Sequence, residues 1–94
     1  MMTFDEFLAQ FTVDPDPDDE SYNYRVAINN ISINILKQYK QECEDAGVEV
    51  DMERLMRNAR NAQRYYFIQS RGYGRWLRVF AFQNIIEKLE EADK

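Results

Sequence analysis

The chain has 94 residues, of which 45% are hydrophobic and 31% charged, and its formal net charge is −5. A chain of this length holds one domain, and the composition is that of a folded globular protein, so we expect a single domain over residues 1–94. The absence of histidine excludes every mechanism in which an imidazole acts as a base or binds zinc.

Two features of the sequence bear on where the protein works. Cys43 is the single cysteine, so no disulfide can form within the chain, and no apolar leader precedes the first acidic residues. The apolar run from Val79 to Phe82 is far shorter than the roughly 20 residues that a membrane-spanning helix needs. We therefore expect a cytoplasmic protein that does not enter a membrane.

The first predicted element is a short helix from Phe4 to Phe11. Thr3 and Glu6 have the spacing of a capping box, in which the threonine hydroxyl accepts a hydrogen bond from the backbone N–H of the glutamate. The segment VDPDPDD ends this helix, because proline disfavours helical backbone in the residue before it and aspartate side chains compete for backbone donors.

A second, long helix is predicted to begin at Pro17, with Asp16 as its N-cap, and to stop at Gly47. Five of its apolar residues recur every three or four positions, the period of a buried helical stripe: Tyr24, Ile28, Ile31, Ile35 and Tyr39. An alternative is a strand over residues 28–36, where isoleucine alternates with serine and asparagine. That strand would make the fold α+β.

Two further helices complete the predicted fold. Asp51 is the N-cap of a third helix, whose apolar side carries Met52, Leu55, Met56, Ala59, Ala62 and Tyr66. Gly72 and Gly74 allow a tight connection to a fourth helix from about Arg75 to Glu91, whose stripe is Val79, Phe82, Ile86 and Leu89. The prediction is therefore an all-α, small four-helix bundle with a short first helix, a long second helix, and a hairpin of the third and fourth.

The Asp-rich segment has the beginning of a calcium-loop pattern but not its remainder. Asp14, Asp16 and Asp18 stand at positions 1, 3 and 5 of such a loop, whereas Asp19 replaces its glycine and Arg25 its bidentate glutamate. We interpret the segment as a solvated turn and expect no metal and no cofactor. Because the sequence also places no carboxylate pair in an apolar setting, we assign no catalytic residue and expect the protein not to be an enzyme.

Charge is distributed unevenly along the chain. Residues 1–20 contain seven acids and no base, whereas residues 51–86 contain seven arginines, two acids and no lysine. Arginine binds carboxylates and phosphates with a planar, two-pronged group and stacks on aromatic rings, so this segment indicates ordered contacts. The residues predicted to bind a partner are Arg54, Arg57, Arg60, Arg64, Tyr65, Arg71, Tyr73, Arg75 and Trp76.

Three hypotheses explain these arginines. They pair with the acids of residues 1–20, they bind another protein, as Arg, Tyr and Trp do in interface hot spots, or residues 54–78 bind nucleic acid. The pairing within a chain or between subunits stays open; for function we expect the second, a non-catalytic interaction module that acts as an inhibitor, adaptor or assembly subunit. Nucleic acid is the alternative, and a net charge of −5 disfavours its phosphate contacts. Wide apolar arcs on the second and fourth predicted helices also indicate a homo-oligomer, most simply a dimer in which acids 14–20 of one chain approach arginines of the other.

The first half of the chain resembles a family of viral proteins. The segment TFDEFLAQFTVDPDPDDE, followed by a long helix, is similar to the opening of tailed-phage head-to-tail connector proteins, where a short helix, an acidic turn and a long helix occur in that order. The resemblance covers about the first 45 residues and implies the role of an assembly subunit. It does not extend to MERLMRNARNAQRYYFIQSRGYGRW, so no site residue follows from it.

Overall fold

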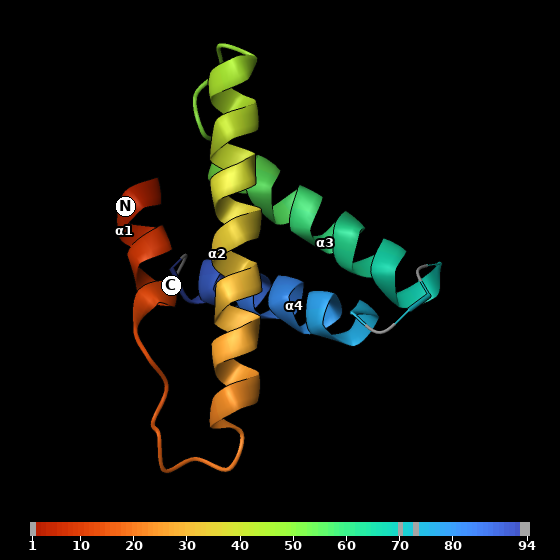
Figure 1. Ribbon diagram of the computed structural model, residues 1–94. Helices are drawn as coiled ribbons and strands as arrows, with labels where there is room; N and C mark the ends of the chain where they lie inside the picture. The colour runs from red at the N-terminus through yellow and green to blue at the C-terminus, as the bar shows by residue number, and fades with distance from the viewer. Residues whose placement is uncertain (1, 70, 73, 93–94) are drawn as a thin grey trace.

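A computed structural model of the chain describes residues 2–69, 71–72 and 74–92 (Figure 1). Its elements are α1 (Phe4–Ala9), the 3-10 helix η1 (Gln10–Thr12), α2 (Tyr22–Asp45), α3 (Met52–Ile68) and α4 (Arg75–Ala92). The long α2 stands at the centre, with α1 on one side of it, α3 diverging on the other side and α4 crossing behind it (Figure 1). These residues form helices and no strand, so the predicted all-α fold with a terminal hairpin is confirmed and the strand over residues 28–36 is wrong.

The predicted capping box starts α1. Thr3 Oγ1 accepts a hydrogen bond from Glu6 N at 3.2 Å, and its hydroxyl donates one to Glu6 Oε1 at 3.0 Å. The chain continues past Ala9 as η1, which brings Phe11 to the core. The rings of Phe7 and Phe11 are almost fully buried and pack edge to face with their centroids 5.2 Å apart. This phenylalanine pair attaches the N-terminal segment to the rest of the molecule.

The long helix begins at Tyr22 and not at Pro17 as predicted. Asp16 Oδ1 accepts a hydrogen bond from the backbone N–H two residues further on at 2.9 Å, and Asp19 Oδ1 accepts one from Ser21 N at 2.9 Å. Such bonds close turns in place of a helical turn. The bonds to Ser21 also hold the pKa of Asp19 below its usual value, the backbone N–H contributing most. Asp16 is therefore a turn residue, and Ser21 occupies the N-cap position of α2.

The turn after α2 forms as predicted, with Gly47 in the left-handed region at φ 69°. Gly47 N donates to Glu44 O at 3.1 Å and Val48 N donates to Cys43 O at 3.0 Å, the hydrogen bonds of a Schellman motif. Asp51 then caps α3 by accepting the N–H of the second helical residue at 2.9 Å, which confirms its predicted role.

The core is organised by the crossing of α2 and α4. Ser32 and Ala81 have no exposed surface there, and Ser32 Oγ lies 2.8 Å from Ile28 O and 3.3 Å from Ala81 O. Small side chains at both positions allow the two backbones to approach closely. One helical turn further along each helix, Leu36 and Ile85 are fully buried and extend the contact.

The hairpin of α3 and α4 is held by stacking and by a half-buried amide. The rings of Tyr66 and Phe82 stack with their centroids 5.9 Å apart. Gln63 Nε2 donates to Val79 O at 3.2 Å and to Gln83 Oε1 at 2.8 Å. The buried residues of α4 include the whole predicted stripe: Val79, Phe82, Ile86 and Leu89. Over the part of the chain that the structure describes, no helix is long and apolar enough to span a membrane.

The first prediction concerns the α2–α4 crossing. Replacing Ser32 by leucine should lower the free energy of unfolding by about 1–3 kcal/mol, because the larger side chain forces the helices apart. Ser32→Ala should cost less than about 1 kcal/mol, since both carbonyls keep their helical partners. Urea denaturation measures both, with the exposed Lys37→Leu as the control on the same helix. Equal stability of Ser32→Leu and the parent protein would contradict a close crossing.

A second prediction concerns Tyr39, whose phenol links α2 to the residue before α3. The Tyr39 ring is only 8% exposed, and its hydroxyl donates to Asp51 O at 3.0 Å. Burial raises the pKa of Tyr39 above its usual value of 10.0, and the neighbouring Cys43 acts in the same direction. Because the folded state keeps the proton more tightly, this stabilisation is complete below pH 10 and is lost as the pH rises through the raised pKa.

The stability difference between the parent protein and Tyr39→Phe should therefore shrink as the pH rises from 8 to about 11. Urea denaturation at a series of pH values measures it. Tyr65→Phe, at a largely exposed position, is measured over the same pH series as the control. A constant difference for Tyr39→Phe would show that its phenol titrates normally.

Candidate protein-binding surface

The four predicted arginines of α3 are all exposed: Arg54, Arg57, Arg60 and Arg64. Arg60 Nη2 lies 3.3 Å from Glu90 Oε1 of α4. Two of the seven acids of residues 1–20 pair elsewhere, Asp5 with Lys40 at 3.2 Å and Asp19 with Arg25 at 3.4 Å. Within the described ranges of one chain, no ion pair joins residues 1–20 to the arginines of α3, so these arginines remain accessible to another molecule.

Arg75 is engaged by its own chain. Its Nε donates to Tyr66 O at 3.0 Å and its Nη2 donates to Phe67 O, so the guanidinium binds carbonyls at the end of α3. The same group lies over the Trp76 ring, 4.8 Å from the centroid. Arg75 therefore closes the hairpin, whereas the sequence placed it with the partner-binding residues. The sequence offers no signal that separates it from the other arginines.

Aromatic side chains from three helices form a continuous row on the surface. Phe67 of α3 contacts Trp76 of α4 at a centroid distance of 5.8 Å, and Trp76 contacts Phe80 at 6.2 Å. Phe80 in turn contacts Tyr24 of α2 at 6.0 Å. These four side chains, called here the aromatic row, are between 42% and 52% exposed. Adjacent large apolar side chains that remain this accessible are a common feature of interaction surfaces.

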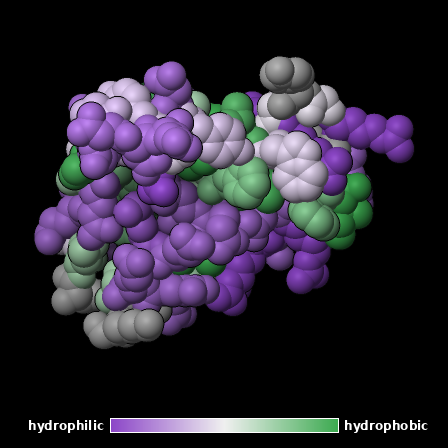
Figure 2. All heavy atoms as spheres, turned by 90° about the horizontal axis from the view of Figure 1, so that it is seen from below, coloured by the Kyte–Doolittle hydropathy of each residue, from purple (hydrophilic) through white to green (hydrophobic). Residues whose placement is uncertain are grey.

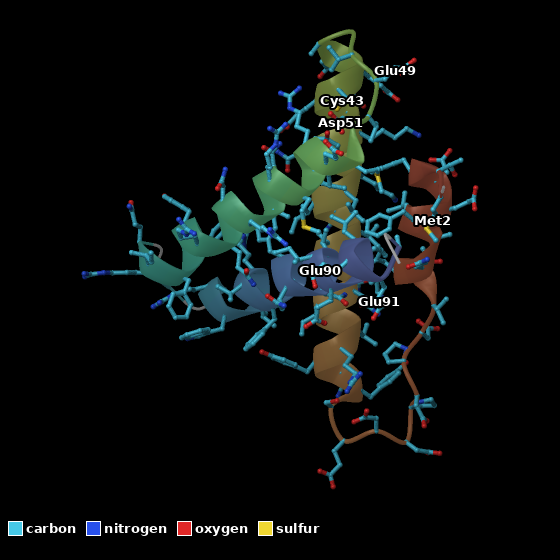
Figure 3. All side chains as sticks on the ribbon, turned by 180° about the vertical axis from the view of Figure 1, so that it is seen from behind. Met2, Cys43, Glu49, Asp51, Glu90 and Glu91 are labelled. Atoms are coloured by element: carbon cyan, nitrogen blue, oxygen red, sulfur yellow. The ribbon has the colours of Figure 1, made fainter. Side chains whose placement is uncertain are left out.

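The aromatic row borders a groove between α3 and α4 with a volume of about 630 Å³. Arg60, Arg64 and Phe67 line it from α3, and Trp76 and Phe80 line it from α4. The ion pair with Glu90, labelled on α4 in Figure 3, lies at the same groove. The groove thus combines guanidinium groups, which can donate hydrogen bonds, with aromatic faces, which can pack against apolar groups. Among the residues with described positions, no three His, Cys, Asp or Glu side chains converge on a possible metal site.

The structure does not gather all the predicted residues in one place. Arg60, Arg64 and Trp76 line the groove, and the exposed Arg57 lies on the same side of α3 by helical spacing. Arg54 and Tyr65, eleven positions apart, share a different side of α3, so they do not face the groove.

Two predicted residues lie in the α3–α4 connection, and others were missed. Arg71 is exposed there, and Tyr73 lies outside the described residues. Phe67, Phe80 and Tyr24 were missed as surface residues. The sequence held one signal for Phe80, because the first two turns of α4 are apolar almost all round.

A second groove, of about 470 Å³, lies where α2 and α3 diverge. It is lined by apolar residues such as Ile31, Ile35 and Ala62, with the amides of Asn34 and Asn58 beside them. None of the strongly exposed aromatic residues lies here. This groove is lined by core residues and by Arg78, whereas the α3–α4 groove carries the exposed aromatic residues together with Arg60 and Arg64.

Comparison with known proteins adds no assignment: no protein family, curated protein or solved structure matches this chain.

The third prediction tests the structural role of Arg75. Arg75→Lys keeps the charge but loses the two-pronged contact with the carbonyls of α3, so it should lower the free energy of unfolding by about 1–2 kcal/mol. The fluorescence of Trp76, the single tryptophan, should change as the guanidinium leaves its ring. Arg57→Lys is the control and should stay within about 0.5 kcal/mol. An Arg75→Lys variant as stable as the parent would contradict this role.

Proposed function

We propose that this protein is a non-catalytic protein-interaction module, an inhibitor, adaptor or assembly subunit, that binds its partner through the α3–α4 groove. The observation that carries the proposal is the exposed aromatic row beside Arg60 and Arg64. Tryptophan, tyrosine and arginine dominate interface hot spots, because they combine a large apolar area with a directional donor. A single buried thiol, Cys43, suits the reducing cytoplasm, where we place the protein.

The groove also indicates the chemistry of the partner. Phe67, Trp76 and Phe80 present apolar faces that a partner's side chains would cover. Arg64 has no ion-pair partner within the described part of the chain, and Arg60 has only an exposed one in Glu90. Guanidinium groups at the edge of an apolar patch favour carboxylates. The partner surface is therefore apolar at its centre and acidic at its edge.

Nucleic acid is less well supported as a ligand of residues 54–78. Trp76 offers a face for stacking, but Arg75 is engaged by the chain and Arg60 is partly neutralised by Glu90. The chain is also net negative, and its acidic loop would repel phosphates.

The fourth prediction tests the proposed function by photo-crosslinking. A photoreactive phenylalanine analogue at position 67, in an extract of the cells from which the protein comes, should crosslink to a discrete protein. The same analogue at Val48, which is similarly exposed in the α2–α3 turn, should give no such product. Arg64→Glu should abolish the product while changing the free energy of unfolding by less than about 1 kcal/mol, because the side chain is exposed.

Arg54→Glu is the matched control, since it reverses the same charge on the same helix but away from the groove, and it should leave crosslinking unchanged. Absence of a protein product at position 67 would sink the proposal. A crosslink to nucleic acid, together with a salt-sensitive shift of DNA or RNA, would replace it by the alternative.

A further inference from the structure

Another hollow, between the acidic loop, α2 and α4, adjoins the α3–α4 groove. Pro15 of the acidic loop and Arg25 and Asn29 of α2 line it, together with Phe80 and Gln83 of α4. Phe80 and Gln83 also line the α3–α4 groove, so the two hollows meet along one ridge of α4. The acidic loop and the arginines of α3 therefore lie on opposite sides of this ridge.

The acidic loop and the arginines of α3, on the two sides of the ridge, carry opposite charge, and Arg25 and Lys88 also line the hollow on the side of the loop. The loop on one side holds five acids between residues 14 and 20, and among the described residues Asp19 alone forms an ion pair, with Arg25. The other side holds Arg57, Arg60 and Arg64, and within the same described ranges Arg60 alone forms one. Figure 3 looks towards α4 and shows nitrogen-tipped side chains along α3 on the left and oxygen-tipped ones along the loop at the lower right.

The aromatic row lies between these two charged regions. It runs from Phe67 over Trp76 and Phe80 to Tyr24, which is next to Arg25. Figure 2, which views the molecule from the side of the loop, shows hydrophilic side chains over the left and middle and hydrophobic or intermediate ones at the right. The ring contacts thus extend the aromatic row from the arginines of α3, near Phe67, to the side of the acidic loop, near Tyr24.

We propose that the partner bound by this surface is a second copy of the same chain, related to the first by a twofold axis between the acidic and basic regions. A twofold axis there brings the loop of each copy against Arg60 and Arg64 of the other and the two aromatic rows together. Both charged contacts form at once, because the surface is complementary to itself. This inference rests on the proposed function and specifies its partner.

The fold does not bring the acidic loop into contact with the arginines of α3 of the same chain. The loop acid Asp19 pairs with Arg25 of α2, and the ridge of α4 separates the loop from α3. Val13, at the start of the loop, is 69% exposed, so the acidic region also offers an apolar side chain. A second copy supplies arginines to the acidic loop and acids to the arginines of α3.

The fifth prediction is a charge-swap experiment read by light scattering with size exclusion. The parent chain should have twice the 11.3 kDa mass of one copy at micromolar concentration, and raised salt should weaken the dimer. One variant, Arg60→Glu with Arg64→Glu, and a second, Asp16→Lys with Asp18→Lys, should each be monomeric. In either variant alone, the side chains at positions 16 and 18 carry the same charge as those at positions 60 and 64, which should raise the dissociation constant at least about tenfold.

An equimolar mixture of the two variants should restore the dimer, because positions 16 and 18 of each variant then face opposite charges at positions 60 and 64 of the other. Arg54→Glu, outside the groove, should dimerise like the parent. Failure of the mixture to associate, or dimers that persist in either double variant, would overturn the inference. Circular dichroism of each variant verifies that monomers are folded.

The outcome separates this inference from the proposed function. If the parent chain is monomeric at all concentrations and position 67 still crosslinks to a different protein, the second-copy inference is wrong and the proposed function stands. If the chain is monomeric and no protein crosslinks at position 67, both are wrong.

Discussion

The close contact of α2 with α4 at Ser32 and Ala81 is the constraint on which the rest of the structure depends. Two helices that approach this closely bury their crossing point completely, and the direction of each then determines which sides remain free. One side of α4 faces α2, and a second receives α3 through Tyr66 and Gln63. The remaining side, with Trp76 and Phe80, is only partly covered by the described part of the chain, through the rings of Phe67 and Tyr24. The exposed aromatic row is thus a geometric result of the crossing.

Capping residues predicted a helix end correctly where their side chain or backbone could form only one pattern of hydrogen bonds. Thr3, Gly47 and Asp51 each act as their type and position indicate, because capping needs only neighbours in sequence. At Asp16 the same chemistry was ambiguous. An aspartate that accepts the N–H two residues on closes a turn or caps a helix with the same bond, and the following residues decide which. The later start of α2 at Tyr22 could not be read from that bond alone.

The candidate surface was predictable in composition but not in arrangement. Arg60, Arg64 and Trp76 were selected from their residue types, and they do line one groove. Tyr24 reaches Phe80 only because α2 crosses α4, and no sequence spacing encodes a contact between helices so distant along the chain. Arg75 was grouped with the other arginines, since its bonds to the end of α3 exist only once the hairpin has closed.

The acidic loop is held at both ends, by buried Phe11 before it and by α2 after it. Pro15 and Pro17 further restrict its backbone, and Asp16 and Asp19 each close a turn within it. The conformational entropy of this segment is therefore lost during folding and is not lost again when the loop contacts another molecule. A charged loop that is ordered in advance binds with a smaller entropic penalty than a free acidic tail of the same composition. The two buried phenylalanines of the N-terminal segment thus influence affinity at a surface that they never touch.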